Sequence, residues 1–160
     1  MSANKYDWHL KIIPEDDKWR QIANGFKRRL PQSLQRKVDI CPIAGGWGKC
    51  LKLVKEFKLD QLEERHLLVL MDFDKRSKER QLAIDDSTQK HPRVFVLGAT
   101  VESENLIKSL GSGGAIACGE RFYSPNMQCP PSIWQDAMLV NPVNQATLPN
   151  LCPVLQKHLT

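Results

Sequence analysis

Acidic residues follow several apolar segments of this chain, and their spacing suits the binding of a divalent metal ion. Glu15 comes directly after one such segment, and Asp72 and Asp74 follow another with a single residue between them. In an extended strand alternate side chains project to one side, so we expect Asp72 and Asp74 to lie together while Phe73 points away. Gathered carboxylates repel one another unless a cation neutralises them. Because Mg²⁺ and Mn²⁺ prefer oxygen ligands, the sequence predicts a site for one of them at Glu15, Asp72 and Asp74.

Acidic side chains at strand ends also cap helices and turns, and this alternative applies to other acids of the chain. Asp16 and Asp17 follow Glu15 at the expected start of a helix, and Glu102 and Glu104 follow the last apolar segment. We favour the capping role for Asp17 and Glu102. For the three acids named first, we favour metal binding.

Four short apolar segments alternate with stretches of helical character, a pattern typical of βαβ units and a mainly parallel sheet. The segments are 10–14, 38–43, 66–71 and 93–98. The last two are apolar almost throughout, as expected for central strands that are covered on both faces. Ligands bind beyond the carboxyl ends of parallel strands, so the acids should share one rim. We therefore predict an α/β fold with about four mainly parallel strands flanked by helices.

Helices are expected in three of the connecting stretches, which are 16–30, 50–57 and 99–111. The first is the clearest, because apolar residues recur in it at helical spacing. The second follows a glycine-rich turn that permits close approach to a ligand. A polar stretch, 72–92, predicts a long loop with a short helix.

The 160 residues are predicted to form one domain, with a core of about 10–111 and an irregular C-terminal extension of 112–160. Within the extension, 131–140 is the best helical stretch and 148–159 is expected to add an edge element. Its apolar residues lack a clear core pattern, so they form either an interface with a partner or a cover for the sheet edge. These residues are Pro130, Pro131, Trp134, Met138, Leu139, Leu151 and Leu155.

Positive charge is concentrated in the first half of the chain, and the formal net charge is +5. A basic run lies between the first two apolar segments and consists of Lys27, Arg28, Arg29, Arg36 and Lys37. Basic surfaces attract phosphate with little regard for sequence. The run therefore predicts a face that binds DNA or RNA and guides it toward the acidic rim. The alternative is that these residues are solvated helix faces and turns.

Two residues of the glycine-rich turn are further candidates for nucleic-acid binding. Trp47 is flanked by glycines on the expected ligand rim and is predicted to stack on a base or a partner. Lys49 is predicted to contact phosphate, or else to be solvated at a helix start. Trp19 and Trp134 lie in apolar helical patterns and are expected in the core.

The five cysteines are scattered and form no Cys-x-x-Cys pair, so neither a zinc site nor a disulfide framework is expected. No apolar run is long enough to span a membrane, and the first residues lack the order of a signal peptide. The expected location is the cytoplasm, with the cysteines as reduced thiols.

The order of these motifs resembles the TOPRIM domain of topoisomerases, bacterial primases and nucleases of the overcoming-lysogenization-defect type. A strand ending in glutamate (IIPEDD), a strand ending in a glycine turn (CPIAGGWGK) and a strand ending in Asp-x-Asp (VLMDFDK) occur in that family's order. The resemblance implies that Glu15 is the catalytic glutamate and that Gly45 or Gly46 is the family's glycine. It also implies that Asp72 and Asp74 bind metal.

In the nuclease branch of this family a further acid on the next helix assists with the metal, which implies a ligand role for Glu102 or Glu104. The resemblance covers about 10–110, and the later stretches also resemble small TOPRIM-like proteins of ATPase-containing phage-defence systems in bacteria. It implies an Mg²⁺- or Mn²⁺-dependent nuclease that acts on nucleic acid as the effector of an anti-phage assembly. The implied partner is an ATPase subunit or a second copy of the chain.

Two other interpretations remain open. The first is a non-catalytic adaptor that keeps the fold and binds an ATPase or a polynucleotide. The second is a receiver-like domain, in which Asp72 accepts a phosphoryl group and Thr100 supplies a hydroxyl group. The receiver requires a lysine after a fifth strand, and no persuasive strand of that kind follows residue 111.

Overall fold

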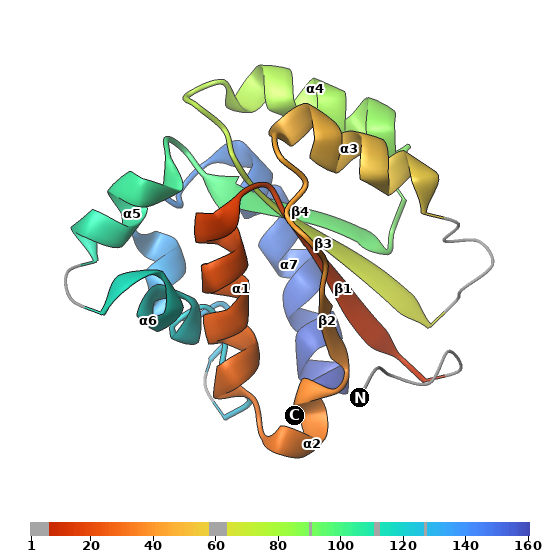
Figure 1. Cartoon of the computed structure of the whole chain (residues 1–160), viewed down its shortest axis with the longest axis vertical. Coiled ribbons are helices and arrows are strands. Elements are labelled where there is room, and N and C mark those ends of the chain that lie inside the picture. Colours follow the sequence, from red (N-terminus) through yellow and green to blue (C-terminus); the bar gives the residue numbers. More distant parts are fainter. Residues whose placement is uncertain (1–6, 58–63, 90, 111–112, 127) are drawn as a thin grey trace.

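The computed structural model describes residues 7–57, 64–89, 91–110, 113–126 and 128–160 (Figure 1). At its centre is a sheet of four parallel strands flanked by helices, which confirms the predicted fold class. The strands are β1 (His9–Pro14), β2 (Val38–Ile40), β3 (Arg65–Asp72) and β4 (Val94–Ala99). Their order across the sheet is β2-β1-β3-β4. The connection that follows β1 therefore leads to one edge of the sheet, and the connection that follows β3 leads to the other edge.

Alternate side chains of the central strands fill two separate cores. The even-numbered residues of β1 and β3, such as Ile12, lie in the core covered by α1 (Asp17–Arg29). Odd-numbered residues, such as Ile13, lie in the core covered by α3 (Trp47–Glu56) and α4 (Ser77–Thr88). The two-residue period that marked these segments as buried strands thus supplies both faces of the sheet.

Two glycines let α1 and α6 (Gly114–Glu120) cross at close range. A Cβ atom on Gly25 would overlap the carbonyl oxygen of Ile116, and one on Gly119 would overlap the carbonyl oxygen of Ile22. Neither crossing position has room for a side chain. Because α1 is held between the sheet and α6, its first turn is fixed against the carboxyl end of the sheet. A one-turn helix, α2 (Gln32–Gln35), then leads to β2.

The C-terminal part of the chain differs from the prediction. The stretch 131–140 contains only a short 3-10 helix, η2 (Ser132–Gln135), and α6 was not predicted. The expected edge element is the second half of a helix of 17 residues, α7 (Pro142–His158). Pro149 and Pro153 lie inside α7, and because proline is rare in helix interiors no helix was predicted for this stretch.

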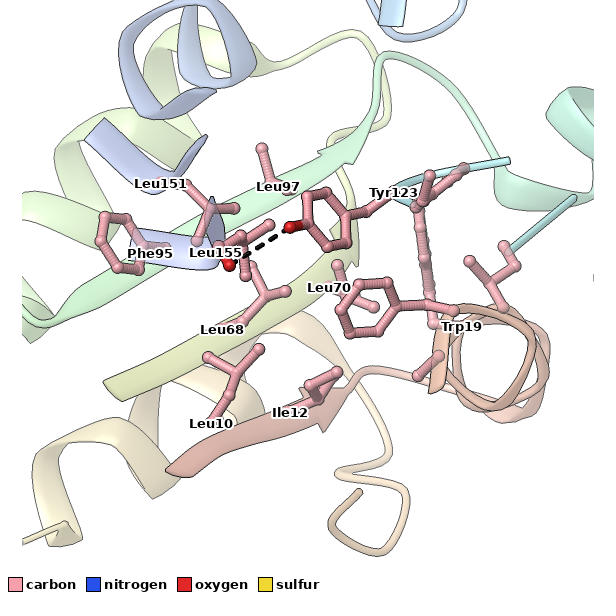
Figure 2. Packing of buried hydrophobic residues seen from close by; sticks show 14 of the residues in the cluster. Leu10, Ile12, Trp19, Leu68, Leu70, Phe95, Leu97, Tyr123, Leu151 and Leu155 are labelled. Atoms are coloured by element: carbon pink, nitrogen blue, oxygen red, sulfur yellow. Dashed lines mark hydrogen bonds between the residues drawn. The ribbon is translucent and has the colours of Figure 1, made fainter. Parts of the chain in front are cut away.

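The C-terminal segment completes the core of the domain (Figure 2). Trp134, Leu139, Leu151 and Leu155 are all buried, and the Tyr123 hydroxyl donates a hydrogen bond to the Leu155 carbonyl oxygen at 3.2 Å. The hypothesis that these residues form an exposed apolar interface is therefore wrong, and the alternative of a covering segment is confirmed. Of the other residues in that set, Pro131 is buried, Met138 is half-buried and Pro130 is exposed.

α7 also closes the outer edge of β4 through one asparagine. The side-chain oxygen of Asn144 accepts a hydrogen bond from the Gly98 N–H at 2.9 Å, and its amide nitrogen donates to the Gly98 carbonyl oxygen at 2.8 Å. The side chain pairs with β4 much as a neighbouring strand would. The part of the chain that the structure describes contains no fifth strand, which the receiver-like interpretation requires.

Two further expectations are corrected. The polar stretch 72–92 contains a full helix of 12 residues, α4, in place of a loop with a short helix. Cys129 and Cys152 form a disulfide that ties the segment before η2 to α7, so these two cysteines are not reduced thiols. Disulfides persist mainly in oxidising compartments, so this bond counts against the predicted cytoplasmic location, which stays a prediction. None of the described helices is long and apolar enough to cross a membrane.

The crossing of α1 and α6 makes a testable prediction. Gly25→Ala should lower the free energy of unfolding by about 1–3 kcal/mol, because the added methyl group must push the two backbones apart. Asn24→Ala is the matched control, since Asn24 is exposed on the same helix and should change stability little. Urea denaturation measures both. Equal stabilities of the two variants would contradict the close crossing.

Candidate metal centre

The carboxyl ends of β1 and β3 lie side by side at the topological switch point of the sheet, between the strand that connects to β2 and the strand that connects to β4. Glu15 follows the last residue of β1, and Asp72 is the last residue of β3. Pro14 and Leu70 are register partners, so the two acids reach the same edge. Crevices at such switch points are the usual ligand sites of open parallel sheets.

Three carboxylates converge at this edge. Glu15, Asp16 and Asp72 each offer an oxygen atom, and these atoms lie within 4.8 Å of one another. Glu15 and Asp72 were predicted as ligands, and the structure brings them together. Asp16 takes the third position, which the sequence analysis gave to Asp74.

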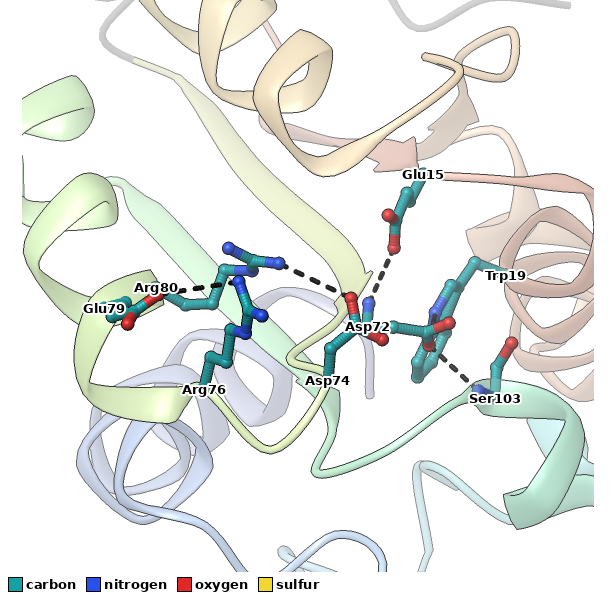
Figure 3. Close-up of polar contacts among 8 residues, drawn as sticks. All are labelled: Glu15, Trp19, Asp72, Asp74, Arg76, Glu79, Arg80 and Ser103. Atoms are coloured by element: carbon teal, nitrogen blue, oxygen red, sulfur yellow. Dashed lines mark hydrogen bonds and ion pairs between the residues drawn. The ribbon is translucent and has the colours of Figure 1, made fainter.

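Protein donors orient each carboxylate through one of its oxygens, and Figure 3 shows these contacts for Glu15 and Asp72. Glu15 Oε2 accepts a hydrogen bond from the Asp72 N–H at 2.7 Å, and Asp16 Oδ1 accepts one from the Trp19 N–H at 3.0 Å. Asp72 Oδ1 accepts two, from Trp19 Nε1 at 2.8 Å and from the Ser103 N–H at 2.9 Å. The second oxygen of each carboxylate accepts no hydrogen bond from the described residues. Each acid therefore retains an oxygen for a hard cation, and the donor set fits Mg²⁺ or Mn²⁺.

The surroundings of these acids favour their protonated forms. Burial is the main reason that the pKa of Asp72 rises from 3.8 to about 7; the charges of Glu15 and Asp16 raise it too, and the hydrogen bond from Trp19 lowers it. Burial likewise raises the pKa of Glu15, with contributions from the charges of Asp16 and Asp74. A bound cation would offset both the burial of negative charge and the mutual repulsion.

Asp74 lies outside the group of three carboxylates. β3 ends at Asp72, and the backbone of Asp74 has a φ of 49°, in the left-handed region, so the strand alternation stops before it. Its Oδ2 instead pairs with Nη2 of Arg80 at 3.4 Å. Phe73 lies in the core on the opposite face from Asp72 and Trp19, as predicted. The sequence analysis placed Asp74 with Asp72 because it assumed an extended chain through residue 74.

Glu102 and Glu104 are also outside the group, and both are exposed. Glu102 immediately precedes α5 (Ser103–Ser109), at the helix start where the capping interpretation put it, although its side chain makes no capping hydrogen bond. What α5 contributes to the centre is the backbone N–H of Ser103.

The predicted basic run lies at the far end of the sheet from these acids (Figure 1). α1 begins at the acidic edge and its 13 residues span about 20 Å, so the basic residues of its last turn, Lys27, Arg28 and Arg29, lie near the amino ends of the strands. Arg36 and Lys37 directly precede β2 and lie at the same end. The basic run is therefore remote from the acidic edge, and its role in guiding nucleic acid toward the rim stays a prediction.

Trp47 and Lys49 lie on the acidic edge, as predicted. The turn before Trp47 is tied to the centre, because the Gly45 N–H donates to the Glu15 carbonyl oxygen at 2.9 Å. The Arg80 guanidinium carbon lies 3.8 Å from the centroid of the Trp47 ring, so the protein itself occupies one face of that ring. Lys49 is exposed at the start of α3.

Sequence reasoning missed the contributions of Asp16, Trp19 and Ser103. Asp16 is the N-cap of α1, and the spacing Asp-x-x-Trp is the signal that could have shown it. Trp19 was placed correctly in the core, where it is fully buried. A buried indole N–H needs an acceptor, and the nearby acids of the rim were the candidates.

Comparisons of the chain with protein-family models, with curated proteins and with solved structures give no match. Function is therefore inferred from the geometry and chemistry of the centre.

The raised pKa of Asp72 predicts how stability depends on pH. Between pH 3.8 and about 7 the native carboxyl holds its proton while the unfolded one loses it, so the wild type should lose stability as pH rises through this range. Asp72→Asn keeps an acceptor for Trp19 and Ser103 and removes the charge. It should raise the free energy of unfolding at pH 8 by about 1–3 kcal/mol, with little gain at pH 4. Urea denaturation at both pH values measures this, and a variant less stable than wild type at pH 8 would contradict it.

Metal binding gives a second test of the same group. Mn²⁺ should bind the wild type in calorimetric titration at pH 8, and Asp72→Asn should weaken binding at least about tenfold because it removes a charged ligand. Asp17→Asn is the control, since the exposed Asp17 pairs with Arg20 outside the group. Binding to the wild type should weaken as pH falls below about 7, where Asp72 takes up its proton. Equal losses in the two variants would argue against the assignment.

Proposed function

We propose that this protein is an Mg²⁺- or Mn²⁺-dependent nuclease that hydrolyses phosphodiester bonds in nucleic acid. The observation that supports this most strongly is the convergence of Glu15, Asp16 and Asp72 at the switch point of the sheet, with one oxygen of each left for a cation. The resemblance of the strand-end motifs to the nuclease branch of TOPRIM domains points to the same chemistry.

The roles of the three acids follow from their surroundings. When bound, the ion would polarise a phosphoryl oxygen and lower the pKa of a coordinated water. Asp72 and Asp16 are fixed by hydrogen bonds involving Trp19 and supply ligand oxygens. Glu15 holds one oxygen on the Asp72 N–H and supplies its other oxygen as the third ligand.

Exposed basic side chains on the acidic edge support an anionic polymer as the substrate. Lys49 lies in the first turn of α3 beside the glycine turn, and Lys75 follows β3 in the loop that leads to α4. These cations can bind phosphates on either side of the scissile bond. We propose that the basic residues at the amino end of the sheet contact more distant phosphates of the same polymer.

The proposed partner, an ATPase subunit or a second copy of the chain in an anti-phage assembly, is supported by the family resemblance. The apolar residues of the C-terminal segment no longer support it, because most of them are buried in the core. The alternative of a non-catalytic adaptor predicts that the acids of the centre can be changed without loss of activity in the assembly. A direct assay of nucleic-acid cleavage distinguishes the adaptor from the nuclease.

The nuclease proposal predicts cleavage of circular single-stranded DNA or of RNA in the presence of Mn²⁺, and none after addition of EDTA. Glu15→Gln should slow cleavage by about 100-fold or more, because it removes a charged ligand of the ion without changing side-chain size. Asp17→Asn should cleave at the wild-type rate. At Mn²⁺ concentrations too low to saturate the site, the wild-type rate should fall as pH drops below about 7, since the proton on Asp72 competes with the ion. Cleavage that is equally fast in Glu15→Gln would refute the proposal.

A further inference from the structure

Arg80 is a buried cation whose hydrogen-bonding capacity is largely unused. Its side chain comes from the first half of α4, and the residue is 6% exposed. Among the described residues, Nε of Arg80 is the buried side-chain polar atom that lacks a hydrogen-bond partner. Its one ion pair is the contact of Nη2 with Asp74 Oδ2, which at 3.4 Å is long for a charge-assisted hydrogen bond.

Two elements fix the guanidinium group of Arg80 beside the carboxylate group. The ring of Trp47, at the start of α3, lies against the guanidinium plane at 3.8 Å, and Asp74 lies at the end of its fork. Figure 3 shows the side chain reaching from α4 toward the end of β3, on the side where Glu15 lies. The arginine is close enough that its positive charge lowers the pKa of Glu15.

An arginine in this position is costly for the fold. Burying a charge without good partners destabilises a protein, and stacking on an aromatic ring offsets only part of this destabilisation. Asp74 does not complete the pairing, because it is itself 48% exposed and bonds to one nitrogen of the fork. The guanidinium group of Arg80 is therefore preorganised to donate hydrogen bonds to a second anion.

We propose that Arg80 binds the substrate phosphate of this centre, donating from its fork to non-bridging oxygens of a nucleic-acid phosphodiester next to the three carboxylates. The proposal rests on the proposed nuclease function, which supplies the class of anion. The planar fork of arginine matches two phosphate oxygens, whereas lysine presents a point charge. Trp47 and Asp74 act as positioning residues, since they hold the fork in the plane where the phosphate arrives.

The test is binding of a fluorescein-labelled ten-nucleotide thymidine strand, followed by fluorescence anisotropy in EDTA over a series of salt concentrations. Arg80→Gln should weaken binding by about tenfold or more and reduce the slope of log affinity against log salt by about 1. Arg80→Lys should also weaken binding but keep the wild-type slope, because it keeps the charge and loses the fork. Arg76→Gln is the control: Arg76 is exposed on the preceding turn and pairs loosely with Glu79, so its loss should cost less than about twofold.

Wild-type protein offers a readout that needs no variant to fold. In ¹H–¹⁵N spectra the Arg80 Nε–H resonance, assigned by its absence from Arg80→Lys, should shift when the thymidine strand is added. A resonance that stays in place, or equal affinity losses in Arg80→Gln and Arg76→Gln, would overturn the proposal.

Calorimetry with Mn²⁺ separates this proposal from the proposed function. Arg80→Gln should bind Mn²⁺ at least as well as wild type, because it removes a positive charge near the carboxylates. If Mn²⁺ fails to bind wild type while the Arg80 effects appear, the metal proposal falls and the phosphate site stands. If Mn²⁺ binds and the Arg80 effects are absent, the phosphate site falls alone.

Discussion

The hydrogen bond from the Trp19 indole to the Asp72 carboxylate is the interaction on which the candidate centre depends. It joins the first turn of α1 to the end of β3. The Ser103 N–H, at the start of α5, donates a hydrogen bond to the same oxygen. On its other side α1 is held against α6 by the glycine crossing. One oxygen of Asp72 is thereby fixed by α1 and α5, and Asp72 offers an oxygen within 4.8 Å of oxygens of Glu15 and Asp16.

The electrostatics of the edge combine two opposed and individually unfavourable arrangements. Three carboxylates lie close together, with burial raising the pKa values of Glu15 and Asp72. Beside them, Arg80 is buried with an incomplete set of partners. The two groups do not neutralise each other by direct contact, since Arg80 pairs with Asp74 and not with the group of three. A cation on the carboxylates and an anion on the arginine would satisfy both, and a metal-bound phosphodiester supplies that combination.

Much of this fold is readable from the sequence, because strong local patterns agree with the tertiary structure. The apolar segments before Glu15 and Asp72 form central parallel strands, and their acids meet at one edge as parallel topology requires. Asp74 was misplaced because β3 ends at Asp72 and Asp74 itself has a left-handed backbone, which no apolar pattern reveals. α7 was hidden by its internal prolines, although Asn141 followed by Pro142 is a recognisable helix start. The disulfide was missed because a pair of distant cysteines depends on tertiary packing alone.

Anomalous diffraction from crystals soaked in Mn²⁺ shows directly whether Glu15, Asp16 and Asp72 hold a divalent ion. We expect a Mn²⁺ peak in contact with carboxylate oxygens of these three residues, with Asp74 still directed toward Arg80 when no phosphate is present. A fully occupied peak at Glu102 or Glu104, or no peak at this edge of the sheet in crystals that bind Mn²⁺ elsewhere, would contradict it.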